Sequence, residues 1–408
     1  MKKVLRVLLA TIGLLALFSA LQLCFAAWGR PYESGGKIRV VDHVVYYRSG
    51  QSYAVVDYFD TDAAAASATA ITIRSEIEGK PVTKISLKSG FGKTNTAVTR
   101  ITLPSSLKSI GQGAFLGFQK VSSLTLPSKL KSIGAGAFSD MRALQTITLP
   151  KKIKTIPKNA FYGCTSLQRI DCKGKVTEYG KSAFQNCASL TWISGYSNVT
   201  YVDDSAFAGT GFPTVRILHT ATYGSAVFAN CKKLTTAVIE GADRPVDLTI
   251  AYGMFSGCTA LKNLRFPQQV GELTFAFHAF QNCTSLQTLT LPRQSEHIYF
   301  NESSFLGCKS LRSVANISGT VTIGASAFSG CAALKSITIP ATAQYVAPWA
   351  FYNCPGLRTV RIDSTDRNLV QSGFLNYVPD NCTVYVKTRA MKRAVQDAGF
   401  NGSVVVSG

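Results

Sequence analysis

Apolar and polar residues alternate along short segments of the chain, and many of these segments end at a proline. Ile101 and Leu103 flank a polar residue, and Leu124 and Leu126 do the same one repeat later. A period of two predicts strands with one face buried and the other exposed. Proline lacks the backbone donor that a continuing ladder needs, so Pro104 marks the end of the first of these strands.

The alternating segment belongs to a longer phrase that recurs along the chain. After the proline come a second apolar pair, then Ala-Phe, then Gly or Asn followed by Cys, then Leu; the cleanest copies occupy residues 101–115, 124–138 and 147–161. A single repeat cannot bury its own apolar edge, whereas a stacked neighbour can, so the pattern predicts a solenoid. Thirteen strands stacked at ~4.8 Å would form an array roughly 60 Å long.

The phenylalanine is the most regular feature of the phrase. Its spacings are 24, 23, 23, 23, 23, 21, 27, 25, 25, 23, 23 and 23 residues. Stacked repeats would place these rings in one continuous buried spine. The anchors are Phe91, Phe115, Phe138, Phe161, Phe184, Phe207, Phe228, Phe255, Phe280, Phe305, Phe328, Phe351 and Phe374.

Eight cysteines each follow one of these phenylalanines by three residues. The chain has no Cys-x-x-Cys pair of the kind that binds zinc. Stacked side chains point the same way, whereas a disulfide needs converging Cβ vectors. We therefore predict a ladder of buried thiols that act as small apolar fillers. Cys172 and Cys382 lie off this ladder and have no assigned role. The eight are Cys164, Cys187, Cys231, Cys258, Cys283, Cys308, Cys331 and Cys354.

The two ends of the chain differ from the repeats. Residues 37–60 hold two strand-like runs split at Ser49–Gln51, which predicts a β-hairpin that covers the first repeat. At the other end, residues 382–386 predict a last strand, and residues 388–398 predict a short helix that stops at Gly399. We divide the chain into 1–26, a signal peptide; 27–69, an N-terminal β cap and connector; 70–375, the solenoid; and 376–408, a C-terminal cap.

The signal peptide follows from a short basic head and an apolar run. Lys2, Lys3 and Arg6 precede residues 7–27, and cleavage is expected after Ala26. An uncleaved anchor and a lipid on Cys24 are the alternatives, and either would hold the protein at a membrane. In each case the remainder of the chain is expected to be secreted or held at the cell surface.

Composition and charge narrow the function. The chain carries 43 Lys and Arg against 22 Asp and Glu, a net charge of +21, which favours an anionic partner. The four histidines share no metal spacing, and the common hydrolase and phosphate-binding motifs are missing from the sequence. We expect no enzyme activity, metal or cofactor. A catalytic site on the irregular repeats 209–300 is the alternative.

These repeats resemble those of the BspA-like, Treponema pallidum-type leucine-rich repeat surface proteins, over roughly residues 70–375. The resemblance is carried by segments such as ITLPSSLKSIGQGAF at 101–115 and by the Ala-Phe and Gly/Asn-Cys pairs that follow. It implies a β-rich α/β repeat fold of about thirteen repeats of about 23 residues, closed by a strand and a short helix. It also implies adhesion or protein–protein contact, since family members are associated with attachment to host matrix proteins and to other cells.

Two surfaces are candidate binding sites. In a leucine-rich repeat the outward strand positions form one concave face, which would bind a partner protein. The alternative is that this face has no binding role, because threonine is common at exposed strand positions in any case. A stripe of stacked lysines, Lys108, Lys131 and Lys154, could instead bind an acidic glycan or envelope polymer, or simply stay solvated. Nucleic acid is not expected, because no aromatic residues interleave with the stripe. The concave candidates are Arg100, Thr102, Thr125, Thr148, Arg169, Trp192, Arg265, Thr290, Thr338 and Arg361.

Overall fold

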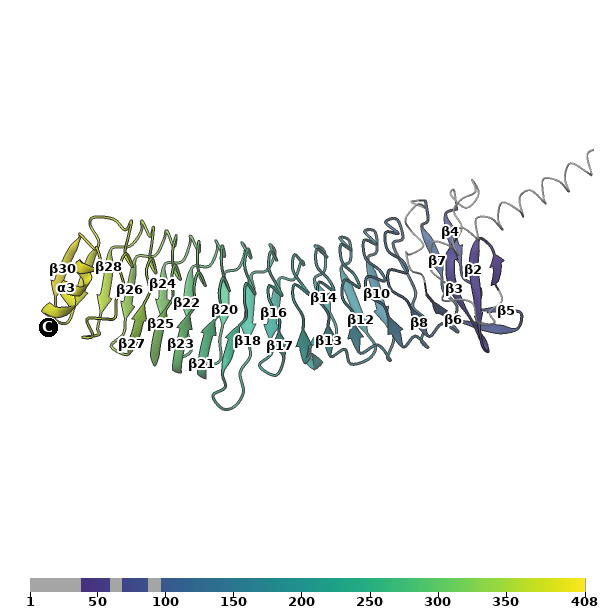
Figure 1. The fold of residues 1–408 in the computed structure, drawn as a ribbon, viewed down its shortest axis with the longest axis horizontal. Helices are drawn as coiled ribbons and strands as arrows, with labels where there is room; N and C mark the ends of the chain where they lie inside the picture. Colours follow the sequence, from purple (N-terminus) through teal and green to yellow (C-terminus); the bar gives the residue numbers. More distant parts are fainter. Residues whose placement is uncertain (1–37, 59–67, 87–96, 408) are drawn as a thin grey trace, which may run out of the picture.

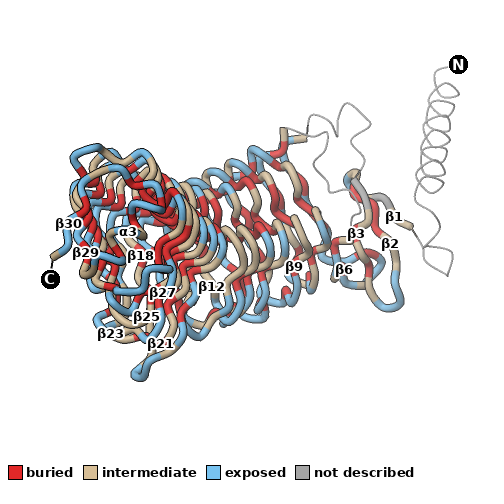
Figure 2. Tube along the Cα trace, turned by 60° about the vertical axis from the view of Figure 1, so that its left-hand side comes forward, coloured by how far each residue is buried: buried red, intermediate tan, exposed pale blue. Residues whose placement is uncertain are grey.

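The protein is an elongated stack of rungs, each of which runs once around the long axis (Figure 1). The computed structural model describes residues 38–58, 68–86 and 97–407. It forms a β-solenoid of about 14 turns of about 23 residues, which confirms the predicted fold class. Figure 2 shows buried residues along the inside of the stack and exposed residues around it.

Strands on one side of the stack form the first ladder, which comes from the alternating segments of the sequence. Neighbouring strands pair in parallel, as in Thr146↔Arg169 and Thr148↔Asp171. The ladder contains β4 (Ala70–Thr72), β7 (Arg100–Thr102), β10 (Thr146–Leu149), β12 (Arg169–Cys172), β14 (Trp192–Ile193), β16 (Thr214–Ile217), β18 (Thr236–Ile239), β20 (Asn263–Arg265), β22 (Thr288–Thr290), β24 (Ser313–Ala315), β26 (Ser336–Ile339), β28 (Thr359–Ile362), β29 (Thr383–Val386) and β30 (Ser403–Val406).

A second set of parallel strands, the second ladder, follows the turn in each rung. It contains β6 (Lys80–Ile85), β8 (Ser109–Ile110), β9 (Ser132–Ile133), β11 (Thr155–Ile156), β13 (Glu178–Tyr179), β15 (Tyr201–Val202), β17 (Thr222–Tyr223), β19 (Leu248–Ile250), β21 (Gln269–Phe275), β23 (Gln294–Phe300), β25 (Thr320–Ile323) and β27 (Ala343–Val346). Both ladders are interrupted. In the first ladder, β14 is the last strand of one sheet and β16 is the first strand of the next. In the second ladder, β17 is the last strand of one sheet and β19 is the first strand of the next.

The predicted phenylalanine spine is present. From Phe115 to Phe351, each ring stacks on the next with centroids 5.0 to 5.9 Å apart and planes 5° to 17° from parallel. All of these rings are buried, and so is Phe374, whereas Phe91 lies outside the described residues. From Phe115 to Phe351 the spine therefore links each rung to the next through direct apolar contact.

Two left-handed residues flank each spine ring, which explains the Gly or Asn that precedes the cysteine. Two residues after Phe184, Asn186 has φ 64°, and two residues after Phe255, Gly257 has φ 73°. Glycine and asparagine tolerate this conformation best. The thiol that follows is buried and donates to the backbone oxygen of the phenylalanine one rung earlier, at 3.0 to 3.5 Å in all eight cases.

The ladder cysteines are free and buried, as predicted. They are more than apolar fillers, because each thiol satisfies a carbonyl between rungs. Thr210 replaces the cysteine in one rung, and its hydroxyl donates to the Phe207 oxygen at 2.7 Å. Of the two unassigned cysteines, Cys172 is half-buried at the end of β12 and Cys382 is buried just before β29.

The N-terminal end has one strand more than the predicted hairpin. The hairpin itself consists of β2 (Val44–Ser49) and β3 (Ser52–Tyr58), joined by a turn at Gly50. β1 (Ile38–Val41) pairs antiparallel with β2, because left-handed Asp42 and His43 turn the chain back within the first run. β3 then pairs in parallel with β6, and β5 (Glu76–Ile77) flanks β6, so these strands begin the second ladder.

The C-terminal end corrects one prediction. The strand at residues 382–386 and the helix at 388–398 are present as β29 and α3 (Arg389–Asp397), and Thr388 caps the helix by accepting from the Met391 backbone N–H at 3.1 Å. However, β29 is not the last strand. β30 pairs in parallel with it, because the Val404–Val406 run continues the ladder after the helix.

We predict that Phe161→Ala lowers the free energy of unfolding by about 3 to 5 kcal/mol, since it leaves a cavity in the spine. Phe161→Leu keeps most of the side-chain volume and should cost less than about 1.5 kcal/mol. Guanidinium denaturation followed by circular dichroism measures both. Equal stability of the two variants and the wild type would show that the spine does not hold the rungs together.

We further predict that stability falls as the pH rises from about 9 towards 12. Burial raises the pKa of the Cys308 and Cys354 thiols to about 12, against 9.0 for an unperturbed thiol. Above pH 9 the unfolded chain therefore loses protons that the folded chain retains, which favours unfolding. Thermal unfolding across this range should show a shallower decline in the variant with Cys308→Ala and Cys354→Ala. An unchanged slope in that variant would contradict the assignment.

Candidate functional site

All ten predicted residues of the first ladder are exposed. Nine of them lie in its strands, where they alternate with buried neighbours, as in Thr146–Leu149. Thr125 is the exception, because its rung forms only an isolated bridge at Ser123 instead of a strand. Leu124 and Leu126 are nevertheless buried on either side of it, so the outward direction of Thr125 is kept.

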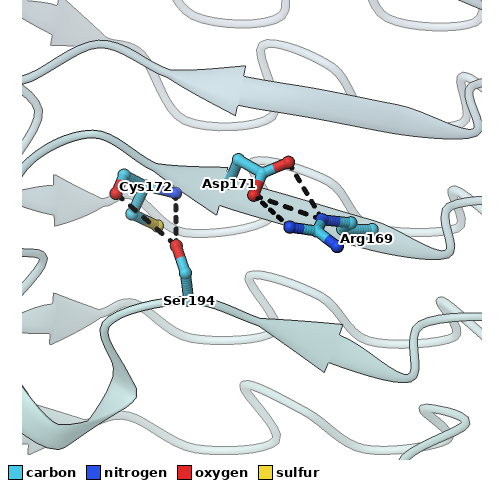
Figure 3. A network of polar contacts seen from close by, with 4 residues as sticks. All are labelled: Arg169, Asp171, Cys172 and Ser194. Atoms are coloured by element: carbon cyan, nitrogen blue, oxygen red, sulfur yellow. Dashed lines mark hydrogen bonds and ion pairs between the residues drawn. The ribbon is translucent and has the colours of Figure 1, made fainter.

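The richest cluster on this face joins two adjacent rungs. Arg169 on β12 donates to both carboxylate oxygens of Asp171, at 2.9 to 3.2 Å (Figure 3). This hydrogen bonding lowers the pKa of the Asp171 carboxyl and raises that of the Arg169 guanidinium. The register of β12 and β14 sets Arg169 beside Trp192, and its guanidinium carbon lies 4.0 Å from the Trp192 ring centroid.

Arginines on the first ladder are commonly paired with a nearby acid. Arg361 on β28 donates to Asp363, just after that strand, at 2.8 Å. Arg216 on β16 pairs with Glu240, just after β18. Among the predicted concave-face candidates, Arg169 and Arg361 are therefore held by acids of this chain. An i, i+2 spacing on a strand puts both side chains on one face, which is the signal that could have revealed the Arg169 and Arg361 pairs.

An apolar pocket opens where the first ladder is interrupted between β14 and β16. Its volume is about 170 Å³, and its lining includes Trp192, Tyr196, Phe212, Val215 and Arg216. Trp192 is 41% exposed at the surface. Tyr196 belongs to the 3-10 helix η1 (Tyr196–Asn198), which follows β14 in place of the usual strand-ending proline. The pocket was not predicted, because it depends on how two successive rungs separate.

Beneath the pocket the interior is more polar than in the regular rungs. Ser194 accepts a hydrogen bond from the backbone N–H of Cys172 at 2.7 Å (Figure 3). The Tyr179 ring packs against that of Tyr196, with centroids 6.1 Å apart, and the Tyr196 hydroxyl contacts that of Tyr223 at 3.4 Å. Burial raises the pKa of all three tyrosines and raises that of Cys172 to about 11, so these groups remain neutral at physiological pH.

The predicted basic stripe is also exposed. Lys108 and Lys131 lie one rung apart, since the Lys131 backbone N–H donates to the Lys108 oxygen at 2.8 Å. Lys154 occupies the next rung, and its backbone oxygen accepts from Thr177 in the rung after that, at 2.8 Å. The stripe runs along the start of the second ladder, so it belongs to a different strand row from the first-ladder residues.

The irregular repeats contain a second cavity, of about 260 Å³, at the interruption between β17 and β19. It is lined by His219, Tyr223 and Asp247, among others. Asp247 accepts a hydrogen bond at 2.8 Å from the backbone N–H of Glu272, which lies in strand β21 of the next rung. His219 is exposed. The nearby Asp203 and Asp204 likewise accept from backbone N–H groups of Lys181 and Ser225, as expected of turn carboxylates.

The described part of the chain holds neither a metal-binding cluster nor a membrane-spanning helix. In residues 38–58, 68–86 and 97–407, no group of three His, Cys, Asp or Glu side chains is arranged to hold a metal ion. In the same residues, no helix has both the length and the apolar character needed to span a membrane. The predicted signal segment, residues 1–26, lies outside the described residues.

A family model described as the BspA type leucine rich repeat region matches residues 88–212, 175–275 and 248–378. These overlapping matches extend over more than half of the 408 residues. The chain belongs to the BspA-type leucine-rich repeat family. No curated protein matches it.

Solved structures of similar fold come from bacteria. A leucine rich cell surface protein from Faecalibacterium prausnitzii is 20% identical, with a TM-score of 0.54, covering 89% of this chain and 98% of its own. The pneumococcal vaccine antigen PcpA is 17% identical, with a TM-score of 0.50, covering 91% of this chain and 99% of its own. At these identities the likeness concerns the fold alone. The family model confirms the predicted family. This BspA-type chain shares its solenoid fold with a protein described as a cell surface protein.

The polar interior of this BspA-type chain gives a stability prediction. The Tyr179 hydroxyl is buried and has no hydrogen-bond partner among the residues that the structure describes, whereas the Tyr223 hydroxyl accepts from the Leu218 backbone N–H at 2.9 Å. Tyr179→Phe should leave the free energy of unfolding unchanged or raise it by up to about 1 kcal/mol, and Tyr223→Phe should lower it by about 1 kcal/mol. Denaturant titration of both variants tests this. A clear loss of stability in Tyr179→Phe would reveal a partner for that hydroxyl.

Proposed function

We propose that this protein acts outside the cytoplasm, secreted or held at a bacterial cell surface, where it binds a partner protein through the first ladder. The role is adhesive and non-catalytic. The family, whose repeats form exposed surfaces suited to protein contact, supports this, and so does the row of exposed strand residues that extends over many rungs. Multiple contacts along one rigid face would add to a useful total affinity.

The observation that carries the proposal is Trp192 with its pocket. Tryptophan and arginine are enriched among the residues that dominate binding energy at protein interfaces. Trp192 is 41% exposed, borders an apolar pocket and is held against Arg169, so its orientation is already fixed before a partner arrives. Asp171 already pairs with Arg169, so the charge of this arginine is not free for a partner. The cluster therefore offers a partner mainly aromatic and apolar contact.

Catalysis is disfavoured by the way the polar groups are used. The carboxylates near the irregular repeats, Asp203, Asp204 and Asp247, each accept a hydrogen bond from a backbone N–H. The bond from the Ser225 N–H lowers the pKa of Asp204, which keeps that carboxylate ionised and unsuited to act as an acid. These carboxylates therefore stabilise the backbone of neighbouring rungs, which supports a binding protein over an enzyme.

The test is binding of the full chain to immobilised fibronectin, fibrinogen and collagen, with Trp192→Ala and Trp349→Ala as a matched pair. Trp349 is 52% exposed but lies in a turn outside the first ladder. We expect binding to at least one of these proteins at both low and high salt. Loss of an interface anchor of about 2 kcal/mol would weaken that binding about 30-fold in Trp192→Ala.

The matched variant Trp349→Ala should bind like the wild type. Equal loss in both tryptophan variants, or no effect of either, would place the interface elsewhere on the solenoid. Absence of binding to all three proteins would remove the support for matrix adhesion.

A further inference from the structure

The lysine stripe is one of two parallel columns. The second column repeats at 23 residues, the same interval as the phenylalanine spine of these rungs, and consists of Lys129, Lys152 and Lys175. Lys129 and Lys152 each lie two residues before a lysine of the first column. Lys175 lies two residues before Thr177, which replaces that lysine in its rung. The residue between the two columns is buried in each rung, as with Leu130 and Ile153. The lysines on either side of it, one in the turn and one just before the strand, are both exposed.

The rungs that carry these columns stack closely. Ser109 and Ile110 of β8 pair with Ser132 and Ile133 of β9, and β11 pairs with β13 in the same way. Between β9 and β11 the ladder is interrupted, but the Gly136 N–H still donates to the Lys158 oxygen at 2.9 Å. Amines on successive rungs are therefore attached to backbone about 4.8 Å apart, and three rungs span roughly 10 Å.

The positive charge of this region is compensated only in part. Residues 101–170 contain ten Lys and Arg but a single acid, Asp140, which lies 3.7 Å from Arg142. Two acids follow in the next rung, where Asp171 pairs with Arg169 and Glu178 accepts a hydrogen bond from Thr155 at 3.2 Å. Within the described residues, none of the six column lysines takes part in an ion pair, in contrast to Arg169, Arg216 and Arg361 on the first ladder. Stacked ammonium groups repel one another, so an anion laid along them would relieve that repulsion.

We propose that the two columns, Lys108–Lys131–Lys154 and Lys129–Lys152–Lys175, bind a linear polyanion whose sulfate or phosphodiester groups repeat along an extended backbone. The polymer would lie along the solenoid axis, so that each rung contributes amines to successive anionic groups. Lysine suits this ligand because its ammonium is a mobile point charge that needs no fixed acceptor geometry. The serine hydroxyls of β8 and β9, Ser109 and Ser132, directly follow Lys108 and Lys131 in the chain and are further donors. The Thr155 hydroxyl of β11 already donates to Glu178.

Nucleic acid fits this surface less well than a glycan or a wall polymer. Large exposed aromatic side chains in the described residues include Trp192, Tyr201 and Trp349, but none between residues 101 and 170. Single-stranded nucleic acid gains much of its affinity from bases stacked on such rings. The stripe therefore favours a ligand recognised by charge and spacing alone.

The experiment measures binding of the full chain to heparin and to poly(glycerol phosphate), which represent the sulfate and phosphodiester sources. The test variant carries Lys108→Thr, Lys131→Thr and Lys154→Thr, because threonine already occupies this column at Thr177. The control variant removes the same number of exposed lysines outside the columns, through Lys232→Thr, Lys309→Thr and Lys262→Gln. Circular dichroism establishes that both variants are folded.

We expect the test variant to bind on the order of 100-fold more weakly than the wild type, since each lysine near a polyanionic surface contributes about fivefold. Its affinity should also depend less steeply on salt, because fewer counterions are released. The control variant should change affinity by about threefold or less, as the effect of distant charge is screened. Whichever of the two polymers is bound with this lysine dependence identifies the source of the anionic groups.

Three outcomes would overturn the proposal. They are equal losses in the test and control variants, wild-type affinity in the test variant, and tighter, column-dependent binding of single-stranded DNA of the same charge. Trp192→Ala should leave polyanion binding unchanged, so failure here and failure of the protein-binding proposal can be told apart.

Discussion

The stacking of each rung on the next is the interaction on which this structure depends. A single rung of about 23 residues has no core of its own, and its phenylalanine, its cysteine and its strand residues are all satisfied by the neighbouring rung. Ring contacts of 5.0 to 5.9 Å, inter-rung thiol hydrogen bonds and parallel strand pairs all act along the same axis. The chain must therefore repeat its backbone geometry closely, including the two left-handed residues around each ring.

Where that repetition loosens, the surface gains features that the regular rungs lack. The 21-residue spacing before Phe228 and the 27-residue spacing after it coincide with the interruptions beside β14 and β17, and a pocket opens at each. The rung before the first interruption also departs from the pattern, because Cys172 lies opposite Leu149 and Tyr179 opposite Ile156 of the preceding rung. A solenoid tolerates such variation, because each rung contacts only its neighbours and a change in one rung therefore alters few other contacts.

Charge is distributed differently on the two candidate surfaces. Three first-ladder arginines are held by carboxylates two residues or one rung away, so this face is close to neutral around Trp192. The lysine columns at the start of the second ladder have no such partners among the described residues. The two surfaces are therefore suited to different ligands, the first to apolar contact with a protein and the second to a polymer recognised by charge.

The sequence by itself determined the repeat, its strands, the buried spine and the free thiols. Each of these follows from a fixed spacing, because equal spacing places equivalent residues at equivalent positions in successive rungs. Outward residues of the first ladder and the Lys108 stripe were predictable for the same reason. Only the tertiary structure decided the inter-rung thiol bonds, the Arg216–Glu240 pair, the Trp192 pocket and the extra strands β1 and β30. These depend on the contacts and relative placement of neighbouring segments, which spacing alone does not fix.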